Sequence, residues 1–88
     1  MKELKIIIKN KLGLHTRAAA MLVENISRYV SDVTIIKEGQ EVDGKSIMGI
    51  MTLAASIGTE LLIKAEGSDE DDVLTKIEDL VERKFDEE

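Results

Sequence analysis

The sequence predicts an α+β domain in which a four-stranded antiparallel sheet is covered on one face by three helices. Two patterns predict it. Short segments alternate between apolar and polar residues, as half-buried strands do, and longer segments repeat apolar residues every three or four positions, as amphipathic helices do. In chain order these segments give β-α-β-β-α-β-α. With 88 residues and no proline, we expect residues 1–88 to form a single domain with one core.

A strand and then a helix are expected at the start of the chain. Positions 4, 6 and 8 are apolar, which is typical of a half-buried strand, and the polar loop 10–13 ends it. From Thr16 to about Tyr29 the apolar positions follow helical spacing, which indicates one buried face. The side chains expected on that face are Ala19, Leu22, Val23, Ile26 and Val30.

The middle of the chain predicts a hairpin. Residues 33–37 alternate as a strand, residues 41–43 form a short partner strand, and Gly39 lies in the turn because glycine tolerates a positive φ. Residues 39–46 also match the nucleotide-binding pattern Gly-x-x-x-x-Gly-Lys-Ser. That site needs a buried strand before the loop and a helix after it in a parallel sheet, and two acidic side chains here would face the phosphates. We therefore interpret this segment as a hairpin strand.

A helix, a strand and a second helix are expected in the rest of the chain. Ser46 is the predicted N-cap of a short helix, with Ile50 and Leu53 toward the core. Residues 61–65 alternate as the fourth strand. The last helix has an acidic first turn, which suits the positive end of the helix dipole, and one apolar face. The side chains expected on that face are Val73, Leu74, Ile77, Leu80, Val81 and Phe85.

Composition and charge exclude several classes of function. The net charge of −6, from 12 basic and 18 acidic residues, argues against nucleic acid as the main partner. No apolar run approaches the roughly 20 residues of a membrane span, and residues 6–8 are too short a run for a signal peptide. Without cysteine and with one histidine, no metal site is expected, and so small a chain has little room for a large cofactor. We expect a cytoplasmic protein with neither a metal ion nor a cofactor.

The one histidine, His15, is the candidate for chemistry. It precedes the first helix, whose free N–H groups and dipole make its N-terminus an anion site. The phosphate-binding residues we expect are Thr16, Arg17 and Ala18, with the planar Arg17 guanidinium suited to phosphate oxygens. Imidazole is partly neutral near pH 7 and is a good leaving group, so it can accept a phosphoryl group and pass it on. A capping or surface role for His15 is the alternative.

Ser46 and the residues after it form a second candidate site. Ser46 is first of all a helix N-cap, and a phosphate there would be tolerated while adding up to about two negative charges. Met48 is expected to face outward, with Ile47 and Met51 at the border of the buried face. Exposed methionines form adaptable binding surfaces, although a short helix with loose apolar edges would show the same pattern.

Two motifs together resemble a known family. Residues 13–17 read Gly-Leu-His-Thr-Arg, and residues 45–53 read Lys-Ser-Ile-Met-Gly-Ile-Met-Thr-Leu. This resembles the HPr family, the histidine-containing phosphocarriers of the bacterial phosphoenolpyruvate-dependent sugar phosphotransferase system, over essentially the whole chain. The resemblance implies an open-faced β-sandwich with sheet order 1-4-2-3. It also implies that His15 accepts a phosphoryl group on Nδ1 from enzyme I and passes it to enzyme IIA domains, with Arg17 steadying the group.

The resemblance implies further partners and roles. Ser46 matches the site that an ATP-dependent HPr kinase/phosphorylase modifies in many Gram-positive bacteria, which makes that kinase and a catabolite-control transcription factor candidate partners. The apolar surface that binds partners around the histidine corresponds to Ala20, Ile47, Met48 and Met51. The implied protein is a monomer and a stoichiometric carrier that forms a phosphohistidine, and it is not an enzyme.

Two positions depart from the usual residues of the family. Ala18 stands where proline is usual and Leu12 where serine or threonine is common, and alanine, the better helix former, leaves the expected fold unchanged. The branch stays open, because residues 10–13 also suit a nitrogen-related regulatory branch while residues 46–49 suit kinase-regulated sugar-type members. The alternatives are therefore a regulatory phosphotransfer module and an interaction module that acts only through Ser46 and the methionine surface.

Overall fold

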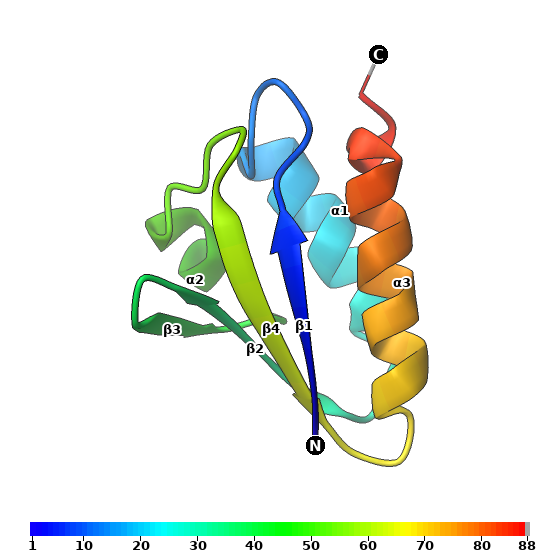
Figure 1. Cartoon of the computed structure of the whole chain (residues 1–88). Helices are drawn as coiled ribbons and strands as arrows, with labels where there is room; N and C mark the ends of the chain where they lie inside the picture. Colours follow the sequence, from blue (N-terminus) through cyan, green and yellow to red (C-terminus); the bar gives the residue numbers. More distant parts are fainter. Residues whose placement is uncertain (88) are drawn as a thin grey trace.

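Four antiparallel strands form one sheet in the computed structural model, which describes residues 1–87. The elements are β1 (Lys2–Ile7), α1 (Thr16–Ile26), β2 (Asp32–Lys37), β3 (Gln40–Asp43), α2 (Ile47–Thr52), β4 (Glu60–Glu66), α3 (Glu70–Glu82) and a short 3₁₀ turn, η1 (Lys84–Asp86). The strand order is β1-β4-β2-β3 with every neighbouring pair antiparallel. The three helices lie on the same face of the sheet (Figure 1). The predicted α+β fold, its element order and its sheet order are confirmed.

The core lies between the sheet and the helices and follows the alternation of the strands. In the inner strand β4, the side chains of Leu61, Ile63 and Ala65 are buried. Ile63 pairs with Leu4 of β1 on one side and with Ile35 of β2 on the other, so apolar residues of three strands share the covered face. Successive side chains of a strand point to opposite faces, so the intervening residues line the open face.

Helix α1 is shorter than predicted, and the expected burial of Val30 is wrong. The helix ends at Ile26, and the side chain of Val30 is 71% exposed. The N–H groups of Val30 and Ser31 donate to the Asp69 carboxylate, and the Tyr29 carbonyl accepts from Lys45 Nζ at 2.6 Å. These distant partners satisfy the backbone where the helix would otherwise continue, so the chain turns toward β2.

Helix α2 is held at both ends by side chains. Ser46 is its N-cap, as predicted, because its Oγ accepts the N–H of Gly49 at 3.0 Å. At the other end, Lys37 Nζ donates to the carbonyl of Leu53 at 2.8 Å. A helix of only six residues has little stability of its own, so these two bonds help to fix the position of α2 on the sheet.

The backbone changes from right-handed to left-handed after α3. Lys84, Phe85 and Asp86 have φ values of 56°, 53° and 60°. Phe85, expected on the buried face of the last helix, lies instead in this turn, yet its side chain is only 2% exposed. The burial of the Phe85 ring anchors the turn, and Glu87, which follows it, contacts Asn10 and His15.

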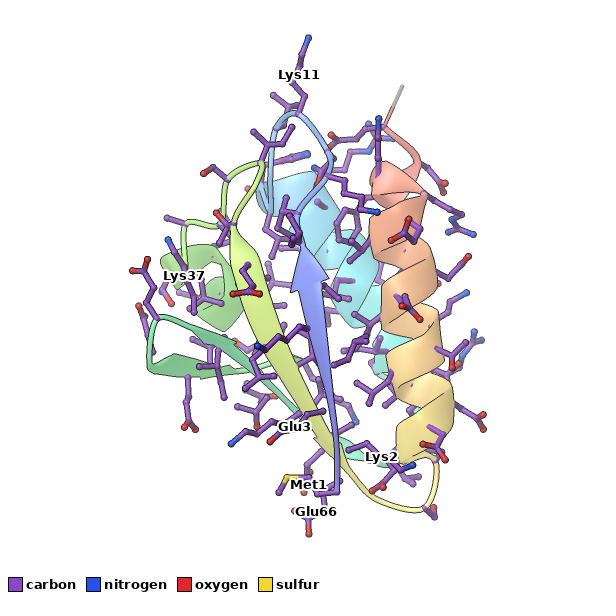
Figure 2. All side chains as sticks on the ribbon, viewed as in Figure 1. Met1, Lys2, Glu3, Lys11, Lys37 and Glu66 are labelled. Carbon is purple, nitrogen blue, oxygen red and sulfur yellow. The ribbon has the colours of Figure 1, made fainter. Side chains whose placement is uncertain are left out.

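The loop that precedes α1 and the C-terminal turn lie at the same end of the molecule. The β1–α1 loop, with Lys11 at its tip, and the end of η1 lie at the end opposite the N-terminus (Figures 1 and 2). Met1 and Glu66 lie together at the other end (Figure 2). Within residues 1–87, none of the helices has the length and apolarity that a membrane crossing requires.

Candidate functional site

His15 occupies the N-cap position of α1, but its side chain does not cap the helix. Its backbone is extended, with φ −76° and ψ 177°, and its carbonyl accepts the first intrahelical bond, from the N–H of Ala19 at 2.8 Å. The imidazole bonds no N–H of the first turn and is 29% exposed. A capping role for the side chain is therefore wrong, and the ring is available for other contacts.

The predicted phosphate-binding residues form the first turn of α1. Because the helical bonds begin at Ala19, the N–H groups of Thr16, Arg17 and Ala18 have no acceptor within the helix. The side chains of Thr16 and Arg17 are exposed, while that of Ala18 is buried, so Ala18 can contribute only its backbone. Three N–H groups and the positive end of the dipole thus lie next to the imidazole of His15.

The loop before His15 is packed against the segment that follows α2. Gly13 has φ +70°, and a Cβ at this position would lie 2.4 Å from the carbonyl oxygen of Ala55. The next residue, Leu14, is buried, and its N–H donates to the same carbonyl at 2.8 Å. This close approach requires glycine and fixes where His15 enters the helix.

Asn10 joins this loop to the C-terminal turn. Its side chain is fully buried, and Nδ2 donates to the Gly13 carbonyl at 2.7 Å and to Glu87 Oε1 at 3.1 Å. Its Oδ1 has no hydrogen-bond partner among residues 1–87. The sequence pattern shows Asn10 only as part of a polar loop, and its role depends on a residue 77 positions away.

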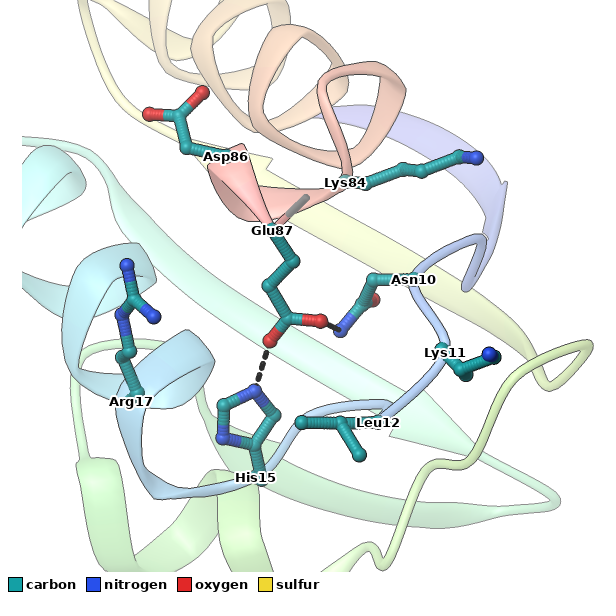
Figure 3. A pocket seen from close by; sticks show the side chains of 8 residues that line it. All are labelled: Asn10, Lys11, Leu12, His15, Arg17, Lys84, Asp86 and Glu87. Atoms are coloured by element: carbon teal, nitrogen blue, oxygen red, sulfur yellow. Dashed lines mark hydrogen bonds and ion pairs between the residues drawn. The ribbon is translucent and has the colours of Figure 1, made fainter.

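The Glu87 carboxylate contacts the imidazole of His15, which the sequence analysis missed. Glu87 Oε2 lies against Nε2 of the ring, and its Oε1 accepts from Asn10 (Figure 3). The hydrogen bond with His15 lowers the pKa of the Glu87 carboxyl, burial opposes this, and Asn10 and the positive charge of Arg17 lower it further. Glu87 is 72 residues from His15 and is one of several acidic residues at the chain's end, so no local pattern distinguishes it.

A cavity of about 670 Å³ opens beside His15 (Figure 3). Its lining residues are Asn10, Lys11, Leu12, His15, Arg17, Lys84, Asp86 and Glu87. Two of the four sequence-predicted residues at this site, His15 and Arg17, line it together with side chains from the C-terminal turn. The charged side chains of the lining are three cations and two carboxylates.

The predicted partner-binding surface lies on α2 and reaches the start of α1. Met48 is 81% exposed, Ile47 and Met51 are partly exposed at the border, and Ile50 is buried, as predicted. The hydroxyl of Thr16 donates to Met51 Sδ at 3.6 Å, which places the last turn of α2 against the first turn of α1. We call the exposed residues Ile47, Met48 and Met51 the α2 patch.

The remaining predicted residues lie at the edges of this region. Ala20, on the second turn of α1, is half-buried. Ser46 is at the N-terminal end of α2, while the hydrogen bond from Thr16 of α1 reaches Met51, near the C-terminal end of α2. Among residues 1–87, no three His, Cys, Asp or Glu side chains are grouped to hold a metal ion.

Comparisons with known proteins agree on one family. The family described as PTS HPr component phosphorylation site matches residues 2–83. The chain is 45% identical over 87 residues to the phosphocarrier protein HPr of Xylella fastidiosa, covering 99% of this chain and 98% of that one. It is 44% identical over 77 residues to the HPr-like protein Crh of Bacillus subtilis, covering 88% and 91%.

Solved structures show the same likeness. A crystal structure of HPr-C-His from Thermoanaerobacter tengcongensis superimposes with a TM-score of 0.96 and 46% identity, covering 100% of this chain and 99% of that one. A second structure from the same organism, described as an HPr dimer, superimposes with a TM-score of 0.77 over 97% and 98%. The likeness is therefore one of sequence and of fold over nearly the full length.

Proposed function

Because the chain belongs to the HPr family of the bacterial phosphotransferase system, we propose that it is a cytoplasmic phosphocarrier that accepts a phosphoryl group on His15 from enzyme I. It then donates the group to enzyme IIA domains for sugar uptake. The observation that carries this proposal is that the His15 imidazole does not cap α1 and adjoins the three N–H groups that have no acceptor within the helix. A nucleophile and a binding site for the phosphoryl oxygens thus adjoin each other.

The transfer needs no other reactant. The Nδ1 lone pair attacks the phosphorus of the donor phosphohistidine, the donor's P–N bond breaks, and its electron pair stays on the donor imidazole. The N–H groups of Thr16, Arg17 and Ala18 bind the phosphoryl oxygens, and the Arg17 guanidinium balances their charge. The group leaves by the reverse chemistry to the next protein, so the chain is a stoichiometric carrier and not a catalyst.

The experiment is labelling from phosphoenolpyruvate with enzyme I. Wild type is expected to take up one phosphate that is labile in acid and stable in alkali, as a P–N bond is. His15→Ala is expected to lose the label and keep the fold, because the side chain lies at a surface helix end, and Thr75→Ala, an exposed position on α3, serves as the control. Full labelling of His15→Ala would refute the proposal.

Partner binding belongs to the α2 patch and Ala20 in this proposal, and Ser46 regulates it. An HPr kinase/phosphorylase would add phosphate at Ser46, where the helix cap accepts an anion. The new charge would lie at the rim of the α2 patch and repel an acidic partner, which acts mainly on the association rate. A catabolite-control transcription factor is the proposed partner of the Ser46-phosphorylated form.

The proposed regulation is tested by the rate of His15 phosphorylation at low and high salt. Ser46→Asp is expected to slow phosphorylation in a manner that salt relieves, and Met48→Asp to slow it by the desolvation cost of a charge in the patch. Gln40→Asp adds the same charge at an exposed position of β3 and is the matched control. Equal rates for all four proteins would refute the binding surface.

The protein that accepts the phosphoryl group from His15 shows whether the chain serves the sugar branch or the nitrogen-related branch. We propose the sugar branch, and phosphorylated protein incubated with sugar-type and nitrogen-type enzyme IIA domains is expected to lose its phosphate faster to the former. We also propose that the chain acts as a monomer, which light scattering during size-exclusion chromatography measures directly.

A further inference from the structure

We propose that Glu87 is a positioning residue for His15, holding the imidazole with its proton on Nε2 and thereby leaving the Nδ1 lone pair free for the phosphoryl group. This inference rests on the proposed function and adds a residue from the opposite end of the chain to its site. It is carried by the contact of Glu87 Oε2 with His15 Nε2 (Figure 3).

The hydrogen-bonding capacity of the two groups fixes the tautomer. An ionised carboxylate only accepts hydrogen bonds, so the ring nitrogen that it contacts must carry the proton. A neutral imidazole has one N–H, and with that proton on Nε2 the other nitrogen, Nδ1, keeps its lone pair. A carboxylate behind a histidine acts in this way in metal sites and in hydrolases, where it sets the tautomer and the orientation of the ring.

The position of the Glu87 side chain is fixed by burial and by a second hydrogen bond. Its side chain is 13% exposed, and its second oxygen accepts from the fully buried Asn10. The turn before it has three consecutive residues in the left-handed region, a conformation that costs energy in residues other than glycine. Burial of Phe85 compensates for that cost, and the result is a carboxylate aimed at the ring.

The other charged groups around the cavity do not replace Glu87. Lys11 comes from the β1–α1 loop, Arg17 from α1, and Lys84 and Asp86 from the C-terminal turn. Asp86 is the other carboxylate, and it pairs with Arg83 Nε at 3.3 Å and is exposed. Glu87 therefore differs from its neighbour in contact and in burial, which makes Asp86 the matched control.

The proton on Nε2 also matters for the product. When Nδ1 takes the phosphoryl group and the proton stays on Nε2, the ring carries a positive charge, which the Glu87 carboxylate balances. A ring that keeps this proton is the better leaving group, because it departs as a neutral imidazole when the P–N bond breaks. The same contact thus serves both acceptance and donation.

Glu87→Gln gives a sharp test because Asn10 fixes which way the amide points. Asn10 Nδ2 is a donor, so the glutamine oxygen is expected to face it and the glutamine NH₂ to face His15 Nε2. That nitrogen must then accept, which places the ring proton on Nδ1 and blocks the nucleophile. Glu87→Asp keeps the charge on a shorter side chain and is expected to restore part of the wild-type behaviour.

Two measurements avoid any partner protein. The ¹⁵N shifts of the single histidine report its tautomer, and potassium phosphoramidate phosphorylates the ring as a small donor. Wild type and Asp86→Asn are expected to show the proton on Nε2 and equal rates. Glu87→Gln is expected to move the proton toward Nδ1 and to react roughly 10-fold more slowly, with circular dichroism to verify the fold.

The outcomes separate this inference from the proposed function. An Nε2-protonated ring and a wild-type rate in Glu87→Gln would overturn the positioning role, even if enzyme I labels the protein. An altered tautomer and a slower phosphoramidate reaction would support the role, even if enzyme I fails to label wild type, and that failure would count only against the carrier function. Equal slowing by Asp86→Asn would show a general charge effect and would also overturn the role.

Discussion

Gly13 is the residue at which a single added carbon has the largest expected effect on the site. Alanine there would place Cβ 2.4 Å from the Ala55 oxygen at φ +70°. Gly39 also has a positive φ, +84°, but nothing among the described residues lies within 4 Å of an added Cβ. We expect Gly39→Ala to cost about 1–2 kcal/mol of unfolding free energy, the cost of the left-handed backbone, and Gly13→Ala to cost more because of the clash. Urea unfolding measures both, and equal costs would contradict the close approach.

Arg17 is expected to act through the shape of its guanidinium and not through charge alone. A planar fork can bond two phosphoryl oxygens, and hydrogen bonds to charged groups contribute about 1.5–3 kcal/mol each. We expect Arg17→Lys to slow transfer from phosphorylated His15 to an enzyme IIA domain by roughly 10-fold, corresponding to the loss of one such bond. Arg28→Lys, at an exposed arginine beside Tyr29, is the control. Unchanged transfer in Arg17→Lys would rule out bidentate binding.

At the level of residues, the sequence predicted the site residues that lie close together in one motif and missed those that are far from it in the sequence. His15 and Arg17 lie in one short motif, so their proximity follows from the start of a helix. Asn10 and Glu87 reach the same site only through the buried Phe85 and the left-handed turn. Both depend on packing between chain segments more than 70 residues apart, which no local pattern encodes.

Among the elements, α2 depends most on its caps. The Oγ of Ser46 accepts the N–H of Gly49, and loss of an N-cap costs about 0.5–2 kcal/mol. We expect Ser46→Ala to lower the unfolding free energy by about 1 kcal/mol, while Ser46→Asp, also a capping residue, keeps it near that of wild type. Urea unfolding of the two variants tests this. A strongly destabilised Ser46→Asp would mean that its effect on transfer comes from structure and not from charge at the α2 patch.

The position at which α1 ends is determined by residues outside the helix. Its apolar periodicity continues to Val30, and the pattern alone therefore predicts a helix to about Tyr29. The helix ends at Ile26 because Asp69 and Lys45 bond the backbone groups beyond it. Periodicity indicates which face of a segment is buried, but a helix ends where a competing partner for its backbone is available. Both partners here lie in turns that are distant in the sequence.

For the whole molecule, Asp69 is expected to govern acid stability at the end remote from His15. Its carboxylate accepts from the Ser31 hydroxyl and from the N–H groups of Val30 and Ser31, and these bonds lower its pKa, with the hydroxyl as the largest cause. A carboxyl whose pKa is lowered by folding stabilises the native state above its ordinary pKa. That contribution is lost as the pH falls through the lowered value.

The matching variant is Asp69→Asn. We expect it to be less stable than wild type at pH 7, with the difference shrinking as the pH falls below the ordinary pKa range of aspartate and through the lowered pKa of Asp69 in the folded protein. Thermal unfolding between pH 2.5 and 7 measures this. The rate of His15 phosphorylation below the unfolding temperature is expected to be unchanged, and a difference in stability that does not vary with pH would contradict the role of the charge.

The arrangement of the whole sheet could be predicted only in part from residue patterns. Alternation in residues 33–37 and 61–65 indicates which side chains face the core, and that assignment is confirmed by the burial of Ile35 and Ile63. It does not say which strands are neighbours, and the order β1-β4-β2-β3 was implied by the family resemblance of residues 13–17 and 45–53. Local patterns determine which side chains of a strand face the core. Which strands are adjacent depends on how the two β-α connections cross the sheet.

The single phenylalanine of the chain has a practical consequence for spectroscopy. Phe85 is buried in the turn that carries Glu87, and the single tyrosine, Tyr29, lies in the turn after α1. Biosynthetic fluorination of either residue type would therefore give one ¹⁹F resonance, with no assignment needed. The Phe85 signal would report, in real time, changes in the C-terminal turn that accompany phosphorylation of His15, while Tyr29 would provide an internal reference.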